Sequence, residues 1–95
     1  MQLIFTDEAL NDLEYIHDFL IKAGVVEVDE IKDRLISSAT RLLDFPKLGI
    51  TVHSSARWGD VRDLFSEHYC LRYTCYQGDV YILRIWHQKE NERNG

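Results

Sequence analysis

DVRDLFSEHYCLRYTCYQGDVYILRIWH, residues 60–87, is the stretch of this sequence that decides the fold. The segments 69–73 and 80–86 are rich in β-branched and aromatic residues, and Gln77-Gly78-Asp79 between them is typical of a hairpin turn. The residues that start at Asp60 supply one more strand before them. The stretch therefore predicts three consecutive strands joined by tight connections.

Alternating side chains divide the middle strand of this stretch into two faces. The apolar face holds Tyr69, Leu71, Tyr73 and Cys75. The opposite face is more polar and holds His68, Cys70, Arg72, Thr74 and Tyr76. The pattern predicts that one face contacts a core and that the other is available for function.

The third strand is largely apolar on both faces, which is typical of a central strand. We expect the residues that face the core to be Tyr81, Leu83 and Ile85. Arg84 then lies on the opposite face with Arg72, and Arg62 can join them from the preceding strand. Two interpretations remain open for these arginines. They form a cluster of like charges, or they are solvated or paired with acids such as Asp60, Asp63, Glu67 and Asp79.

The composition fits one small domain spanning residues 1–95. The chain has 16 acidic and 11 basic residues and a net charge of −5, which argues against broad electrostatic binding to nucleic acid. No apolar run is long enough to cross a membrane and no signal peptide precedes the domain, so we expect a cytoplasmic protein. Cys70 and Cys75 point to opposite faces of one strand, which disfavours a disulfide and fits a reducing compartment.

Two amphipathic helices are predicted before these strands. A short strand at residues 2–5 leads into Thr6, whose side chain can cap a helix, and Gly24 ends that helix. Its apolar face holds Ala9, Leu10, Leu13, Ile16, Phe19, Leu20 and Ala23. Its polar face holds Asn11, Asp12, Glu14, Asp18 and Lys22.

The second helix is expected to run to about Phe45. Its predicted buried face holds Ile31, Leu35, Ile36, Ala39, Leu42, Leu43 and Phe45. Residues 46–49 form a turn, and residues 50–59 are expected to form a mixed polar loop. The order β-α-α-β-β-β predicts an α+β fold in which a two-helix hairpin packs on one face of a largely antiparallel sheet. We expect the packing to use Leu13, Ile16, Leu20, Leu35, Leu42, Leu71, Leu83 and Ile85.

Five separated motifs resemble the RelE/ParE superfamily of small bacterial toxins. They are Thr6-Asp-Glu-Ala-Leu-Asn-Asp-Leu13, Leu42-Leu-Asp-Phe-Pro-Lys-Leu-Gly49, Gly59-Asp-Val-Arg62, Tyr69-Cys-Leu-Arg-Tyr73 and Val80-Tyr-Ile-Leu-Arg-Ile-Trp-His87. Together they extend over nearly the whole chain. Residues 46–49, Arg62, Tyr73 and His87 favour the ParE-like branch. The chain departs from that pattern at Cys70 and at Gln88-Lys89, where arginine is usual.

The resemblance implies the toxin of a type II toxin–antitoxin system, neutralised by a cognate antitoxin. A ParE-like toxin would occupy a protein target such as DNA gyrase, with Arg62, Arg72, Arg84, His87 and Lys89 as residues that bind the target or the antitoxin. A RelE-like toxin would cleave messenger RNA on the ribosome. Arg62 and Arg84 would then stabilise charge on the phosphate, and His87 would act as general acid or base.

A third interpretation is a non-toxic interaction module of the same fold. The resemblance implies no metal and no organic cofactor under any of the three interpretations. It leaves open whether the protein forms a homodimer or a larger toxin–antitoxin assembly.

Overall fold

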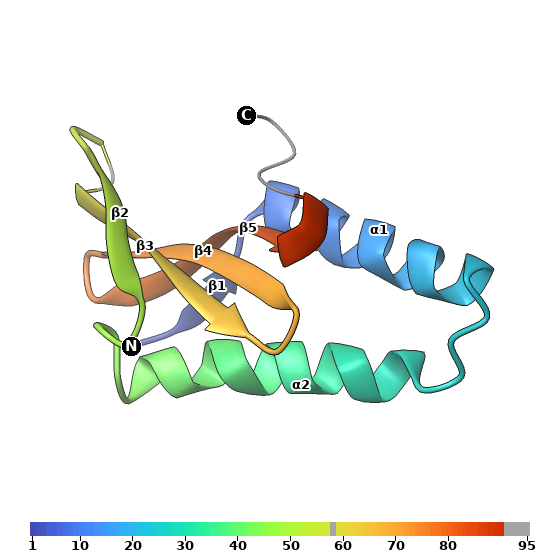
Figure 1. The fold of residues 1–95 in the computed structure, drawn as a ribbon. Coiled ribbons are helices and arrows are strands. Elements are labelled where there is room, and N and C mark those ends of the chain that lie inside the picture. Colours follow the sequence, from blue (N-terminus) through green and yellow to red (C-terminus); the bar gives the residue numbers. More distant parts are fainter. Residues whose placement is uncertain (58, 91–95) are drawn as a thin grey trace.

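The computed structural model describes residues 1–57 and 59–90 of the chain. In these residues two helices pack against a five-stranded sheet (Figure 1). The elements are β1 (Leu3–Phe5), α1 (Asp7–Lys22), α2 (Val28–Thr40), a 3₁₀ turn (Arg41–Leu43), β2 (Ile50–Ser55), β3 (Gly59–Ser66), β4 (Tyr69–Tyr76), β5 (Asp79–His87) and a second 3₁₀ turn (Gln88–Glu90). The predicted α+β fold with its helical hairpin is confirmed.

The strands lie in the order β1-β5-β4-β3-β2. Neighbouring strands are antiparallel except β1, which runs parallel to β5. The prediction of a polar loop at residues 50–59 was wrong, because Ile50–Ser55 forms β2 and pairs with β3. Nearly all of β2 is exposed, since it is an edge strand. Ile50-Thr51-Val52-His53 alternates apolar and polar residues, but this run of four is followed by two serines, so the strand signal in the sequence is short.

Thr6 caps the start of α1, as the sequence predicts, and its side chain also contacts the neighbouring strand β5. The Thr6 hydroxyl accepts a hydrogen bond from the Ala9 amide at 3.2 Å. The same hydroxyl lies 3.0 Å from the carbonyl oxygen of Ile82 and 3.1 Å from that of Leu83, and it can donate to either. Thr6 therefore ends β1, caps α1 and attaches both to β5.

The core lies between the helices and the sheet, and it contains Ile16, Leu20, Leu35, Leu42, Leu71 and Ile85 as predicted, with Leu13 packed at its rim. Leu83 and Tyr81 do not belong to it, and Val80 and Ile82 are buried in their place. The cause is a β-bulge. Arg72 pairs with Arg84 but Tyr73 pairs with Ile82, so Leu83 is an extra residue on β5. A bulge reverses the alternation of faces along a strand, which sequence periodicity does not reveal.

Polar contacts attach α2 to the turn between β3 and β4. Arg34 forms an exposed ion pair with Glu67 at 2.7 Å, and the hydroxyl groups of Ser38 and Ser66 lie 2.6 Å apart. These contacts fix the outer face of α2 relative to the sheet.

The burial of several helix residues differs from what the helical periodicity of the sequence predicted. Asp12 was assigned to the polar face of the first helix, yet only 1% of it is exposed. Four large apolar residues assigned to buried faces are exposed, namely Leu10, Phe19, Ile36 and Phe45. An apolar stripe wider than the core contact is typical of a helix that also meets a partner.

Candidate partner-binding site

Arg72 is held by a buried acid on the neighbouring strand. Its Nε and Nη2 atoms donate to the two carboxylate oxygens of Asp63 at 2.8 and 3.0 Å. The guanidinium carbon also lies 5.0 Å from the ring centre of Trp86. A bidentate ion pair combined with an aromatic face fixes an arginine in one orientation. The ion-paired interpretation of the sequence is therefore confirmed for Arg72, with Asp63 as the acid.

Arg84 is paired with the buried Asp12 of α1. Its Nε and Nη2 atoms donate to the Asp12 carboxylate at 2.8 and 3.2 Å, and the Ile85 amide donates to the same carboxylate at 2.8 Å. The hydrogen bond to Asp12 is the main reason that the pKa of Arg84 lies above its ordinary value. Arg84 and Arg72 are neighbours across β4 and β5, as predicted, but a carboxylate already binds each of them.

Arg62 does not join Arg72 and Arg84. It pairs across the strands with Tyr73, on the opposite face from Arg72, and its Nη1 donates to the Gly49 carbonyl at 2.8 Å. The Tyr73 hydroxyl donates to the Pro46 carbonyl and accepts from the Gly49 amide, both at 2.8 Å. Arg62 and Tyr73 thus hold the turn at residues 46–49 against the sheet. The family resemblance rests in part on these residues, and their hydrogen bonds are structural.

Gly49 lies so close to the sheet that no larger residue fits there. A Cβ atom on Gly49 would lie 2.7 Å from the Asp63 carbonyl oxygen and 2.8 Å from a ring carbon of Tyr73. The close approach explains a glycine at this position, because any side chain would push the turn away from β3 and β4.

The hydrogen bonds of Tyr73 lead to a prediction about stability and pH. We expect Tyr73→Phe to lower the free energy of unfolding by about 1–3 kcal/mol, because the Gly49 amide loses its buried acceptor. Burial raises the pKa of Tyr73 above its ordinary value. The folded state therefore holds the Tyr73 hydroxyl proton more tightly than the unfolded state. The stability that this protonated hydroxyl contributes is present below about pH 10 and is lost as the pH rises further.

Urea unfolding at a series of pH values measures both effects. The difference between the parent and Tyr73→Phe should shrink above about pH 10. Tyr76→Phe is the matched control, because Tyr76 is exposed. A difference that stays constant through the alkaline range would contradict the role assigned to the Tyr73 proton.

His87 lies at the end of β5, beside two aromatic rings. It pairs with Tyr69 across the strands, and the two ring centres are 5.2 Å apart in an edge-to-face arrangement. The His68 ring is stacked with that of His87, with a centroid distance of 6.0 Å. The Nδ1 atom of His87 accepts a hydrogen bond from the Lys89 amide at 3.1 Å. The imidazole is therefore oriented by the Tyr69 ring and by the Lys89 amide.

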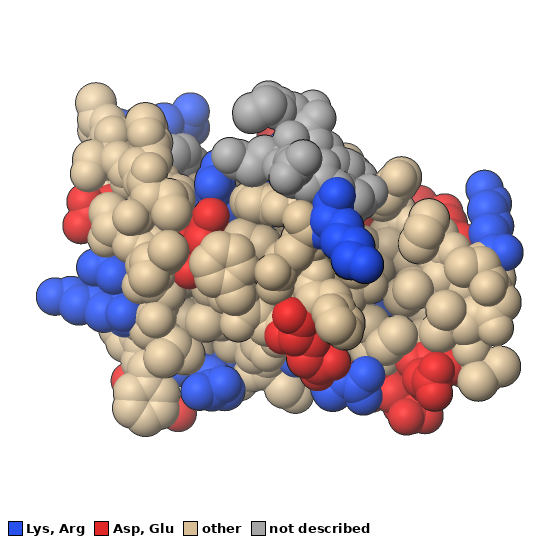
Figure 2. Space-filling view, in the orientation of Figure 1, with Lys and Arg blue, Asp and Glu red and all other residues tan. Residues whose placement is uncertain are grey.

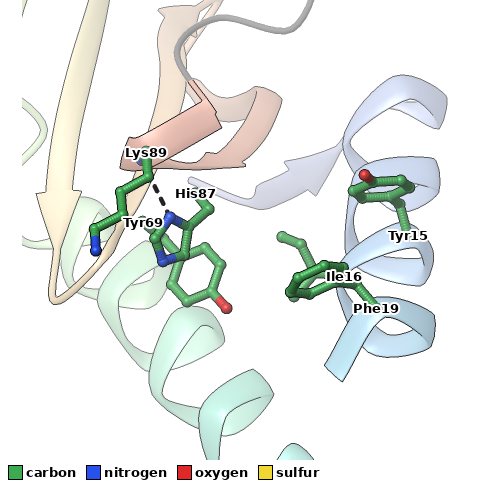
Figure 3. A pocket seen from close by; sticks show the side chains of 6 residues that line it. All are labelled: Tyr15, Ile16, Phe19, Tyr69, His87 and Lys89. Carbon is green, nitrogen blue, oxygen red and sulfur yellow. Dashed lines mark hydrogen bonds between the residues drawn. The ribbon is translucent and has the colours of Figure 1, made fainter. Parts of the chain in front are cut away.

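A cleft opens beside His87, between the end of the sheet and α1 (Figure 3). It has a volume of about 390 Å³ and is lined by Tyr15, Ile16, Phe19, Tyr69, His87 and Lys89. Tyr69, His87 and Lys89 form one wall in Figure 3, and the three residues from α1 face them. Phe19 is 60% exposed, which is unusual for phenylalanine. The cleft offers apolar and aromatic surface, and we refer to it as the aromatic cleft.

The structure separates the predicted site residues into three places. Arg72 and Arg84 lie together on the sheet, His87 and Lys89 lie together at the aromatic cleft, and Arg62 lies at the turn of residues 46–49. His87 pairs with Tyr69 and Arg62 pairs with Tyr73. Tyr69 and Tyr73 are four residues apart on β4, which places the backbone positions of His87 and Arg62 about 13 Å apart along the strands.

Some residues of the site were not found from the sequence. Tyr15 and Phe19 were missed as cleft residues, although their spacing of four places them on one helix face. Asp12 was missed because its assigned helix face was polar. Its burial beside an arginine 72 positions away leaves no local signal in the sequence.

Two further observations concern metals and membranes. Among residues 1–57 and 59–90, no three histidine, cysteine or acidic side chains lie together as a metal site requires. In the same residues no helix is long and apolar enough to cross a membrane.

The fold and site together define a small α+β protein with an aromatic cleft at one end of its sheet. Residues 3–92 match the family described as ParE toxin of type II toxin-antitoxin system, parDE. The chain therefore belongs to this family, and the predicted membership of the RelE/ParE superfamily and its ParE-like branch is confirmed.

A solved structure shares the fold. The structure described as the chromosomal ParDE TA system from P. aeruginosa superposes with a TM-score of 0.72 at 22% sequence identity. The match covers 92% of this chain and 95% of the other. No curated protein matches this sequence significantly.

Proposed function

We propose that this chain is a toxin that acts by binding DNA gyrase in the cytoplasm and that a cognate antitoxin neutralises it. Membership of the ParE toxin family supports the class of protein. The observation that carries the mode of action is the dispersal of the residues a nuclease would need. Arg84 is held by Asp12, Arg62 holds the turn at Gly49, and His87 lies at another end of the sheet.

A ribonuclease needs these groups around one scissile phosphate. Arginines that stabilise a developing charge must be aimed at it, and the general acid or base must be within hydrogen-bonding reach. Arg62 and His87 are too far apart for this in the arrangement described above. The visible surface also carries acidic and basic side chains intermixed, without a continuous basic area for RNA (Figure 2). Both observations favour a toxin that binds over one that cleaves.

The aromatic cleft is the surface that we assign to the protein partners. Aromatic residues supply much of the binding energy in protein interfaces, and Tyr15, Phe19 and Tyr69 supply three of them here. Lys89 also lines the cleft, and its positive charge favours an acidic residue on the partner. The family resemblance implied Arg72 and Arg84 as binding residues too, but the carboxylates of Asp63 and Asp12 already pair with them.

Two assays on the purified chain separate the proposed modes of action. We expect inhibition of DNA supercoiling by gyrase, and no cleavage of messenger RNA in a ribosome-dependent translation reaction. Cleavage of ribosome-bound message would instead establish the RelE-like nuclease. A folded chain that is inert in both assays and does not arrest growth when induced would establish a non-toxic interaction module.

Variants at the aromatic cleft test the assigned surface. We expect Phe19→Ala and Lys89→Ala to weaken growth arrest and gyrase inhibition by about tenfold or more, because each removes a contact at the cleft. Lys47→Ala is the matched control, since it removes one exposed lysine from the turn at residues 46–49. If the cleft variants fold normally and inhibit gyrase as strongly as the parent, the target is bound elsewhere.

A further inference from the structure

The sheet has one long edge that is open to pairing. β2 forms this edge with six residues, whereas β1 at the other edge has three. All of β2 except Ser55 is exposed. An edge strand presents unpaired amide and carbonyl groups to which another strand can bind.

The chain around β2 carries no charge, in contrast to the rest of the molecule. Residues 48–56, between Lys47 and Arg57, form the longest uncharged run in the sequence. The surface over β2 is correspondingly almost free of red and blue in Figure 2, with charged side chains on either side of it. Natural edge strands usually carry a lysine, a proline or an inward-pointing charge that prevents pairing. β2 has none of these and only a bulge between Thr51 and His53.

Apolar side chains extend this edge into a small hydrophobic surface. Ile50 on β2 is 58% exposed, and it lines a hollow of about 320 Å³ together with Leu48 and Phe65, which are also exposed, and with the charged Arg41 and Asp63. Val52 adds a further exposed apolar group on the strand. An uncharged edge with exposed apolar side chains beside it can supply both backbone hydrogen bonds and burial to a second strand.

We infer that β2 pairs antiparallel with β2 of a second copy of this chain, which joins the two sheets into one. Each copy carries a net charge of −5, so two copies repel each other wherever their acidic surfaces meet. The uncharged run is the place where they approach at the least electrostatic cost. A two-fold axis beside β2 also matches each edge to itself, and it brings Ile50 of both copies to one interface.

The bulge decides how strong this contact is. It interrupts β2 at Val52 and leaves only short segments of regular edge on either side. The interface is therefore small, and the dimer forms reversibly with concentration. Salt should strengthen the association or leave it unchanged, because salt screens repulsion between the two acidic copies. An interface built on ion pairs would weaken instead.

Sedimentation equilibrium over a range of protein concentrations tests the inference, with Ile50→Lys as the decisive variant. We expect the parent chain to form dimers and Ile50→Lys to raise the dissociation constant by about tenfold or more, because each copy then places an ammonium group in the otherwise uncharged interface. Ile21→Lys is the matched control. Ile21 is 54% exposed on α1, and its replacement changes the net charge equally, so this variant should dimerise like the parent.

Hydrogen exchange on the parent chain gives a second measurement that needs no variant. Amides within residues 50–55 should exchange more slowly at high protein concentration than at low concentration, and those of α1 should not change. A parent chain that stays monomeric at its highest soluble concentration would overturn the inference. So would a dimer that resists Ile50→Lys and protects amides elsewhere.

Discussion

Replacing Ile82 with alanine is expected to lower the free energy of unfolding by about 2–5 kcal/mol, whereas Leu83→Ala should cost about 1 kcal/mol. Ile82 is completely buried in the core, and Leu83 is the extra residue of the bulge and only partly buried. Truncating a buried side chain loses its transfer free energy and leaves a cavity, and a partly exposed side chain loses less of both. Urea unfolding of the two variants measures the difference directly.

The two substitutions control for each other, since they remove similar apolar groups from adjacent residues of one strand. Without the bulge, strict alternation would place Leu83 in the core with Ile85 and would expose Ile82. A larger loss for Leu83→Ala than for Ile82→Ala would therefore show that β5 runs without a bulge at this point.

Asp12→Ala is expected to destabilise the protein by about 3 kcal/mol. The substitution leaves the Arg84 guanidinium without its bidentate acceptor and the Ile85 amide without its hydrogen bond. The loss is at the lower end of the range for buried ion pairs, because the Arg84 side chain is 28% exposed and can turn toward water. Thermal or urea unfolding of the purified variant provides the measurement.

Two further variants serve as controls for this prediction. Asp18→Ala removes the same charge from an exposed position on α1 and should change stability by less than about 0.5 kcal/mol. Asp12→Ala combined with Arg84→Met should be more stable than Asp12→Ala alone, because no unpaired charge remains beside the core. If Asp12→Ala and Asp18→Ala prove equally mild, the ion pair contributes little to the fold.

The elements that sequence predicts well are those with a strong local signal. Thr6 marks the start of α1 because its side chain caps the helix, and Gly24 marks the end because it has no side chain and adopts a positive φ. Gln77-Gly78-Asp79 marks the hairpin between β4 and β5. The family motifs were also sufficient to identify the class of toxin. These features depend on a few neighbouring residues, so they can be recognised without knowledge of the rest of the chain.

The features that sequence could not supply depend on contacts between distant residues. The bulge at Leu83 changes which residues of β5 are buried, yet nothing in the apolar run around it distinguishes Ile82 from Leu83. Arg84 pairs with Asp12, which the helical periodicity of α1 had placed on the polar, solvent-facing side of the helix. The candidate site changed accordingly, from a row of arginines to the aromatic cleft at the end of β5.

The parallel pairing of β1 with β5 has a consequence for how the protein is made. Hydrogen bonds join Gln2 to Asp79 and Asp12 to Arg84, which are 77 and 72 residues apart. During translation β1 and α1 leave the ribosome long before β5, and until then β1 has no strand to pair with. Contacts of such high sequence separation also slow folding, since a long chain segment must close before they form. A growing chain therefore cannot complete the aromatic cleft until β5 has emerged, which delays any toxic activity until that strand has been made.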